Sequence, residues 1–236
     1  MNQKAGTVGL TLLVGYLIFI AAVGLPKFLL SGTAALLATQ ALELVLALGA
    51  IALLGKRDFA GYGFRKAVPG TARSMILPGV AALALGAAAT ALMVLNGGQG
   101  NPVARQLNFP QIVLFVWIFS SIIEEIFTRG FIQGNLASLS DVRISRLPLP
   151  VLISALFFCS MHLSLLLAGL DLVSLLIILA FTFGVGLLAG WQRYASGSLW
   201  PAVGIHFLAN VGGMIGGIIV AIITVIVTGK PPLSPQ

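Results

Sequence analysis

The chain has 236 residues, of which 58% are hydrophobic and only 8% are charged, and its formal net charge at pH 7 is +7. Soluble proteins average about 25% charged residues, so this composition excludes a soluble domain and predicts an all-α, polytopic membrane protein. The excess of Lys and Arg is expected to follow the sidedness of the loops, and no nucleic-acid partner is expected.

Seven apolar stretches approach the ~20 residues that a helix needs to cross the hydrocarbon core. The first is longer than the ~7–15 apolar residues of a cleavable signal peptide, so we interpret it as a span. An eighth span would require a division of the long fourth or seventh stretch. The predicted spans are Thr7–Leu25, Thr33–Leu54, Ser74–Leu95, Gln111–Ala137, Leu149–Ala168, Leu172–Trp191 and Trp200–Thr228.

Basic residues predict the orientation of these spans. The loop Gly55–Arg73 is rich in Lys and Arg, and the positive-inside rule places this loop and the N-terminus in the cytoplasm. Ten of the 13 Lys and Arg residues then lie on the inner side, as expected for a multi-pass protein of the inner (cytoplasmic) cell membrane. The same loop carries Phe59, Tyr62 and Phe64, which suit either an interfacial segment on the inner leaflet or a plain basic loop.

The chain divides into three parts by pattern. Residues 1–110 predict a three-helix membrane region with the basic loop 55–73, residues 111–229 predict the helices that carry the polar motifs, and residues 230–236 predict a disordered tail. Glycines at four-residue spacing predict close helix packing without specifying an oligomeric state. These pairs are Gly186 with Gly190, Gly212 with Gly216, and Gly213 with Gly217.

Two of the six acidic residues, Glu124 and Glu125, are adjacent within the predicted fourth span. A charge near the bilayer centre costs roughly 2.5–3.5 kcal/mol on insertion scales, so intramembrane acids indicate a functional site. Glu125 and Arg129 have the i, i+4 spacing of a helical ion pair, whereas Glu124 is rotated by about 100°. We therefore predict a supporting role for Glu125 and a general-base role for Glu124.

The two histidines of the chain, His162 and His206, also lie within predicted spans, and Asn210 shares a helix face with His206. Together with the acids they predict one internal polar cluster, to which Glu43 is a further candidate. The depths of Glu124 and His162, each ~20 Å from the predicted inner helix ends, suggest access from the cytoplasm through a water-filled cavity. The alternative is a set of polar contacts that only holds the bundle together.

This residue set suits the activation of water in two ways. A Zn²⁺ ion could be bound by His162, His206 and Glu124, with an open position for water. Alternatively, no cofactor is needed: Glu124 and His162 polarise water while His206 and Asn210 stabilise an oxyanion. The sequence does not choose between the two, but it lacks the His-Glu-x-x-His motif of zincin-type proteases.

Three short motifs carry a resemblance to a known family. They are Glu124-Glu125-x-x-x-Arg129, Phe158-x-x-x-His162 and His206-x-x-x-Asn210. In this order, each on its own apolar segment, they resemble the motifs of the CPBP family, the CAAX-protease and bacteriocin-processing (Abi) proteins, which includes the Ras-converting CAAX endopeptidases. The resemblance covers about residues 111–213.

The resemblance implies an intramembrane endopeptidase, either glutamate-dependent or a metalloprotease, that acts on a membrane-associated, prenylated or other peptide substrate. It implies that Glu124 is the base, that His162 helps to activate water, and that His206 with Asn210 binds the oxyanion or a metal. Glu125, Arg129 and Phe158 would support the site. The compact chain looks like a prokaryotic member, whose partners are peptides or membrane proteins within the bilayer.

Two other functions are compatible with the same residues. A non-catalytic membrane regulator or scaffold would keep the fold without using Glu124 as a base. A proton-coupled transporter would use the buried acids and histidines as a proton relay. Such transporters often contain inverted repeats, and the sequence shows no useful internal repeat.

Overall fold

The computed structural model describes residues 2–98, 100–102 and 104–228, so the predicted tail 230–236 lies outside the described residues. Within this part of the chain, seven helical segments are long and apolar enough to cross a membrane, which confirms the predicted all-α membrane bundle. These segments are Lys4–Leu29, Gly32–Leu54, Thr71–Leu95, Phe109–Asn135, Leu149–Leu166, Leu172–Ser196 and Trp200–Thr228.

Several spans consist of more than one helical element. The α-helices are α1 (Asn2–Leu29), α2 (Gly32–Leu54), α3 (Thr71–Ser74), α4 (Ile76–Leu95), α5 (Phe109–Gln111), α6 (Ser121–Glu125), α7 (Gln133–Asn135), α8 (Leu149–Met161), α9 (Leu172–Ser196) and α10 (Trp200–Thr228). The π-helices are η2 (Ile112–Ser120) and η3 (Ile126–Ile132). The 3₁₀-helices are η1 (Ala104–Gln106), η4 (Ala137–Leu139) and η5 (His162–Leu166), and the strands β1 (Arg143–Ile144) and β2 (Leu147–Pro148) form a small antiparallel hairpin.

The fourth span begins at a well-defined cap. Asn108 and Gln111 exchange two hydrogen bonds of 3.0 Å in a capping box, which satisfies backbone N–H groups at the helix start. From there the span continues as the π-helix η2, becomes α-helical in α6 and returns to a π-helix in η3. The turns of a π-helix are wider than those of an α-helix. Wide π-turns are frequent at functional sites, and here they flank the short segment that carries both acids of the predicted motif.

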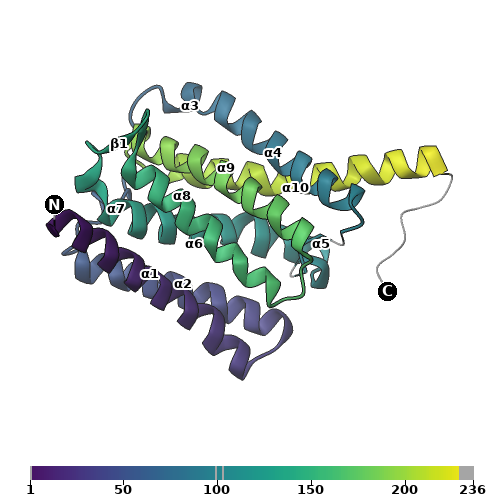
Figure 1. Ribbon diagram of the computed structural model, residues 1–236, viewed down its shortest axis with the longest axis horizontal. Helices are drawn as coiled ribbons and strands as arrows, with labels where there is room; N and C mark the ends of the chain where they lie inside the picture. The colour runs from purple at the N-terminus through teal and green to yellow at the C-terminus, as the bar shows by residue number, and fades with distance from the viewer. Residues whose placement is uncertain (1, 99, 103, 229–236) are drawn as a thin grey trace.

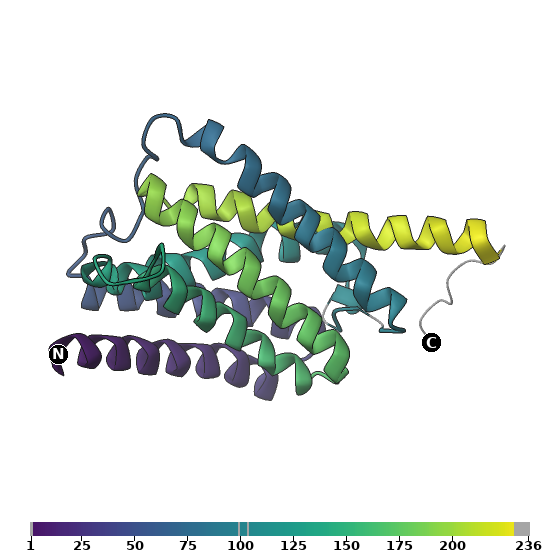
Figure 2. The same ribbon diagram turned by 45° about the horizontal axis from the view of Figure 1, so that its top comes forward.

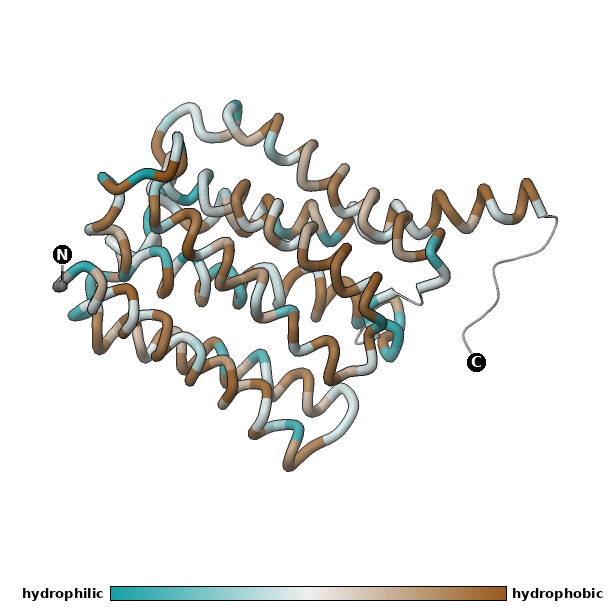
Figure 3. The backbone as a smooth tube through the Cα atoms, viewed as in Figure 1, coloured by the Kyte–Doolittle hydropathy of each residue, from teal (hydrophilic) through white to brown (hydrophobic). Residues whose placement is uncertain are grey.

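The helices form an elongated bundle in which α1 and α2 lie together on one side (Figure 1). On the opposite side α4 crosses α10, whose C-terminal part extends past the other helices (Figure 2). Hydrophobic residues cover the lengths of the helices, while hydrophilic residues gather mainly at their ends (Figure 3). Apolar side chains such as Phe28, Leu77 and Leu167 are highly exposed on the surface, as expected for a lipid-facing exterior.

The basic loop between α2 and α3 is fastened to the protein. The Arg65 Nε–H donates to the Gly197 carbonyl over 2.8 Å, and the Arg193 guanidinium donates to the Gly61 carbonyl, also over 2.8 Å. Tyr62 is buried, and its hydroxyl donates to Asn135 over 3.0 Å. Burial of the Tyr62 ring raises the pKa of its phenol, with a smaller contribution from Asp58. Tyr62 therefore packs against the bundle, which neither predicted description of this loop anticipated.

The close contact between α4 and α10 depends on glycine. A Cβ atom added at Gly212 would collide with the backbone carbonyl of Leu83, and one at Gly216 would collide with that of Ala87. At Gly217 the same atom would lie 3.6 Å from the Thr90 methyl group, an ordinary contact. The predicted glycine pair Gly212 and Gly216 therefore lies in a tight helix–helix interface.

We expect Gly212→Ala to lower the free energy of unfolding by about 1–3 kcal/mol, because the backbone of α4 must move to accept the methyl group. Gly217→Ala is the matched control and should leave stability within about 0.5 kcal/mol of wild type. Thermal unfolding of both purified variants in one detergent measures the difference. Equal midpoints for the two variants would contradict the proposed interface.

Candidate active site

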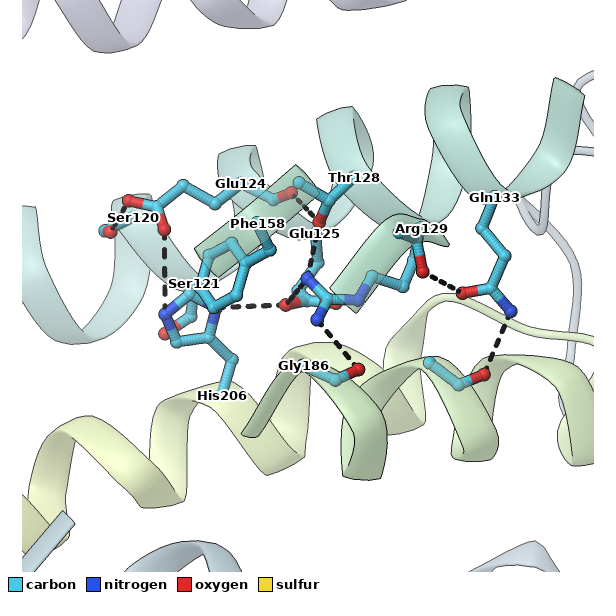
Figure 4. Close-up of polar contacts among 12 residues, drawn as sticks. Ser120, Ser121, Glu124, Glu125, Thr128, Arg129, Gln133, Phe158, Gly186 and His206 are labelled. Carbon is cyan, nitrogen blue, oxygen red and sulfur yellow. Dashed lines mark hydrogen bonds and ion pairs between the residues drawn. The ribbon is translucent and has the colours of Figure 1, made fainter. Parts of the chain in front are cut away.

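The two adjacent acids of α6 have different surroundings (Figure 4). Glu125 is completely buried and accepts a hydrogen bond of 2.9 Å from Arg129 Nη1, in an ion pair whose side chains are both 0% exposed. The Glu124 side chain is 23% exposed and accepts a hydrogen bond from Ser120 Oγ. The structure thus places the acids as their spacing predicts, with Glu125 paired to Arg129 and Glu124 directed elsewhere.

One imidazole contacts both acids. His206 Nδ1 lies 3.0 Å from Glu125 Oε1, and Nε2 lies 3.9 Å from Glu124 Oε2. The first distance is within hydrogen-bonding range, whereas the second is too long for a direct hydrogen bond. The contact between His206 and Glu125 was not predicted, because helix periodicity says nothing about which residue of α10 reaches α6.

Phe158 packs against the cationic and imidazole groups of the site. Its ring centroid lies 4.7 Å from the Arg129 guanidinium carbon, 5.0 Å from the His162 ring and 5.3 Å from the His206 ring. The Phe158 carbonyl also accepts a hydrogen bond of 2.9 Å from His162 Nδ1. Because Phe158 is only 1% exposed, it fixes the positions of three side chains from three elements at once.

Asn210 lies near the cluster but bonds to the fourth span. Its amide donates to the Val116 carbonyl over 2.9 Å and to Ser121 Oγ over 3.2 Å. Gln40 of α2 similarly donates to the Phe115 carbonyl over 2.8 Å. The side chains of α10 and α2 thus bind consecutive carbonyls of η2. In this structure Asn210 offers no free N–H to an oxyanion beside Glu124, and it positions η2 instead.

Two successive side-chain hydrogen bonds connect the fourth span to α9. Arg129 Nη2 donates to the Gly186 carbonyl over 3.1 Å, and one turn later Gln133 Nε2 donates to the Gly190 carbonyl over 2.9 Å. A Cβ at Gly186 would lie 3.3 Å from Arg129 Nη2, and one at Gly190 would lie 3.2 Å from Gln133 Oε1. The glycine spacing predicted this close contact, but nothing in the sequence identified Gln133 as a partner.

Glu124 and His162 line a cavity of about 190 Å³. A second cavity, of about 290 Å³, is lined by His162 and Asn210. Both cavities are also lined by Asn101 and Ala104, from the connection before the fourth span. His162 therefore stands at the wall between the two spaces.

The cavities lie toward the end of the bundle opposite the basic loop 55–73. Helix α8 ends at Met161, so His162 lies near the end of its span that adjoins the connection to α9. The first cavity is lined by the starting half of α2 and of the fourth span, and by the 101–104 connection. With the predicted orientation this end faces outward. Access from the cytoplasm stays a prediction, and the orientation of the spans decides it.

The arrangement of possible metal ligands bears on zinc binding. No group of three or more His, Cys, Asp or Glu side chains lies at metal-binding spacing within residues 2–98, 100–102 and 104–228. The donor types nevertheless suit zinc, because the Nδ1 atoms of His162 and His206 are bound by a carbonyl and a carboxylate, as in many zinc-ligating histidines. The site therefore has suitable donors, but the described residues do not form a preassembled three-ligand site.

Comparison with known proteins identifies a family model that matches part of the chain. Residues 106–212 match the family model described as type II CAAX prenyl endopeptidase Rce1-like. No curated protein and no solved structure matches the chain. The matched range contains the three polar motifs and ends two residues after Asn210.

We expect Arg129→Met to destabilise the fold by about 3–5 kcal/mol, because it leaves the Glu125 carboxylate buried without its partner. The control is Arg73→Met, at an exposed position outside the site, which should change stability by less than about 0.5 kcal/mol. Thermal unfolding in detergent measures both. A loss no larger than that of the control would mean that the buried pair adds nothing.

The orientation predicted by the positive-inside rule places the connection beside the cavities outside the cell. In a Cys159→Ser background, Gln106→Cys lies on the exposed connection near the cavities, and Asp141→Cys lies on the exposed connection at the opposite end. A membrane-impermeant maleimide should label Gln106→Cys in intact cells and Asp141→Cys only after permeabilisation. The reverse pattern would place the cavities on the cytoplasmic side.

Proposed function

We propose that the chain, which belongs to the type II CAAX prenyl endopeptidase Rce1-like family through residues 106–212, is an intramembrane endopeptidase with Glu124 as its general base. One observation carries the proposal. Of the two adjacent acids, Glu125 is buried in an ion pair with Arg129. Glu124 instead lines a cavity, and its Oε2 lies 3.9 Å from His206 Nε2. A water on the cavity side of this pair, within hydrogen-bonding distance of both atoms, would contact the Glu124 carboxylate and the His206 imidazole together, ready for activation.

The proposed reaction assigns one role to each group. Glu124 removes a proton from the water as its oxygen attacks the carbonyl carbon of the peptide bond. His206, protonated on both ring nitrogens and oriented by its Nδ1–H bond to Glu125, donates from Nε2–H to the oxygen that becomes negatively charged. As the tetrahedral intermediate collapses, the C–N bond breaks and Glu124 returns its proton to the leaving amine.

His162 is the second group at the cavity. Its Nδ1 is bound to the Phe158 carbonyl, which orients the ring and leaves Nε2 available for water or substrate. We place His162 on the substrate side of Glu124, where it hydrogen-bonds the attacking water. Asn210 acts indirectly, because its amide holds η2 and thereby the backbone that precedes Ser120 and Glu124.

Zinc dependence is the alternative form of the same proposal. Glu124, His162 and His206 would hold the ion after a rearrangement of their side chains. When bound, zinc would supply an activated water and polarise the substrate carbonyl. Proteolysis in the presence of EDTA, with metal analysis of the purified protein, distinguishes the two forms.

The substrate class follows from the location of the site. Glu124 lies inside a membrane span, so the substrate is a peptide or membrane protein whose cleaved segment enters the bilayer. The matched family is named for prenylated CAAX substrates, and a farnesylated peptide is therefore one arm of the test. An unmodified hydrophobic peptide of the same sequence is the other.

We expect Glu124→Gln to reduce hydrolysis of quenched-fluorescence peptides by at least about 100-fold, because the amide cannot accept the proton of water. The assay uses purified protein in liposomes with the farnesylated and unmodified peptide pools. Matching unfolding midpoints for wild type and variant would show that folding is intact. Equal hydrolysis by both proteins would exclude Glu124 as the base, and no hydrolysis by either would favour a non-catalytic scaffold.

A further inference from the structure

Glu43 is a buried acid that the proposed reaction does not use. It lies near the middle of α2 and is 5% exposed. Its Oε1 is buried without a hydrogen-bond partner among the described residues. Burial of an unpaired carboxyl oxygen is unfavourable, so such a residue within a membrane span indicates a partner that binds there.

Gln40 has a similar unpaired oxygen one turn earlier. Its Nε2 donates to the Phe115 carbonyl over 2.8 Å, which fixes the orientation of the amide. The other end of the amide, Oε1, is buried and has no partner. Residues three apart share a helix face, so α2 presents two hydrogen-bond acceptors side by side.

Both residues line the cavity that contains Glu124 and His162. No Lys or Arg is among the described residues that line it, and much of the remaining wall is apolar, including Phe19, Val23 and Leu36. The cavity volume of about 190 Å³ is smaller than the ~300 Å³ at which small-molecule pockets begin, and suits a single side chain. The space therefore combines an apolar wall with acceptors that lack donors.

We propose that Gln40 and Glu43 form a specificity subsite that binds the positively charged, N–H-donating side chain of a lysine or arginine in the peptide substrate. The inference rests on the proposed endopeptidase function, since it places this side chain in the same cavity as Glu124. An ammonium or guanidinium group would donate to both oxygens while its methylene stem packs against the apolar wall. An acidic side chain would be repelled by the carboxyl groups of Glu43 and Glu124, which both line the cavity, and an aliphatic one would leave the oxygens of Gln40 and Glu43 unpaired.

A binding test does not require an active enzyme. The probe is n-butylammonium, which reproduces the lysine side chain, and the comparisons are 1-butanol and butyltrimethylammonium, which lacks N–H donors. The unfolding midpoint of the purified protein is followed as each probe is titrated. We expect saturable stabilisation of wild type by n-butylammonium and little by the other two probes. Equal stabilisation by all three probes would overturn the subsite.

Substitutions at Gln40 and Glu43 test whether n-butylammonium binds at these two residues. Glu43→Gln and Gln40→Leu should each weaken n-butylammonium binding, the former by about tenfold or more because a charge-assisted hydrogen bond is lost. The matched control is Gln192→Leu. Gln192 also donates through Nε2 to a carbonyl, that of Ser74, and also has a buried, unpaired Oε1, but it does not line the cavity. Equal binding by wild type and Glu43→Gln would overturn the proposal.

Cleavage then separates specificity from catalysis. Two quenched-fluorescence peptides that differ only by lysine or norleucine near the cleaved bond are compared. Wild type should favour the lysine peptide, and Glu43→Gln should lose this preference through a higher KM with little change in kcat. If Glu43→Gln instead lowers kcat equally for both peptides, Glu43 serves the chemical step and the subsite is refuted. Failure of Glu124→Gln to affect hydrolysis would refute the proposed function, while the binding titration is judged independently.

Discussion

The buried ion pair between Glu125 and Arg129 is the interaction on which the polar interior depends. Both side chains are 0% exposed, so neither charge is stabilised by solvent. A buried pair of this kind is stabilised by further hydrogen bonds, although Glu125 Oε2 and Arg129 Nε have no hydrogen-bond partner among the described residues. Thr128, the Gly186 carbonyl and the Phe158 ring supply contacts to Arg129, and His206 bonds to Glu125. The pair therefore fixes η3, α8, α9 and α10 relative to one another.

This constraint also separates the roles of two identical, adjacent side chains. Glu125 is held from two sides and cannot turn toward a substrate. Glu124 keeps one oxygen on Ser120 and directs the other toward His206 and the cavity. Since Glu125 orients His206 through Nδ1, the ion pair indirectly aims the opposite ring nitrogen at Glu124. Preorganisation of this kind lets a polar site act without rearrangement during the reaction.

The part of the chain outside the family match contributes to the same site. Helix α2 lies before residues 106–212, yet Gln40 bonds to η2 and Glu43 lines the cavity of Glu124. The matched helices carry the groups assigned to chemistry, whereas α1 and α2 form a wall of the space in which a substrate would lie. Under the proposed function, α2 would influence substrate choice without any change in the three motifs.

The sequence by itself determined the membrane class, the seven spans and the separation of Glu124 from Glu125, because hydropathy and the i, i+4 spacing are local properties. It also identified the glycines at the contacts of α9 and α10. Only the tertiary structure decided which nitrogen of His206 meets which acid, that Asn210 bonds to η2, and that Gln133 and Gln40 join the network. It also placed the cavities toward the end of the bundle opposite the basic loop 55–73. These features depend on how separate helices are rotated and offset against one another, and no repeat within a single helix encodes that offset.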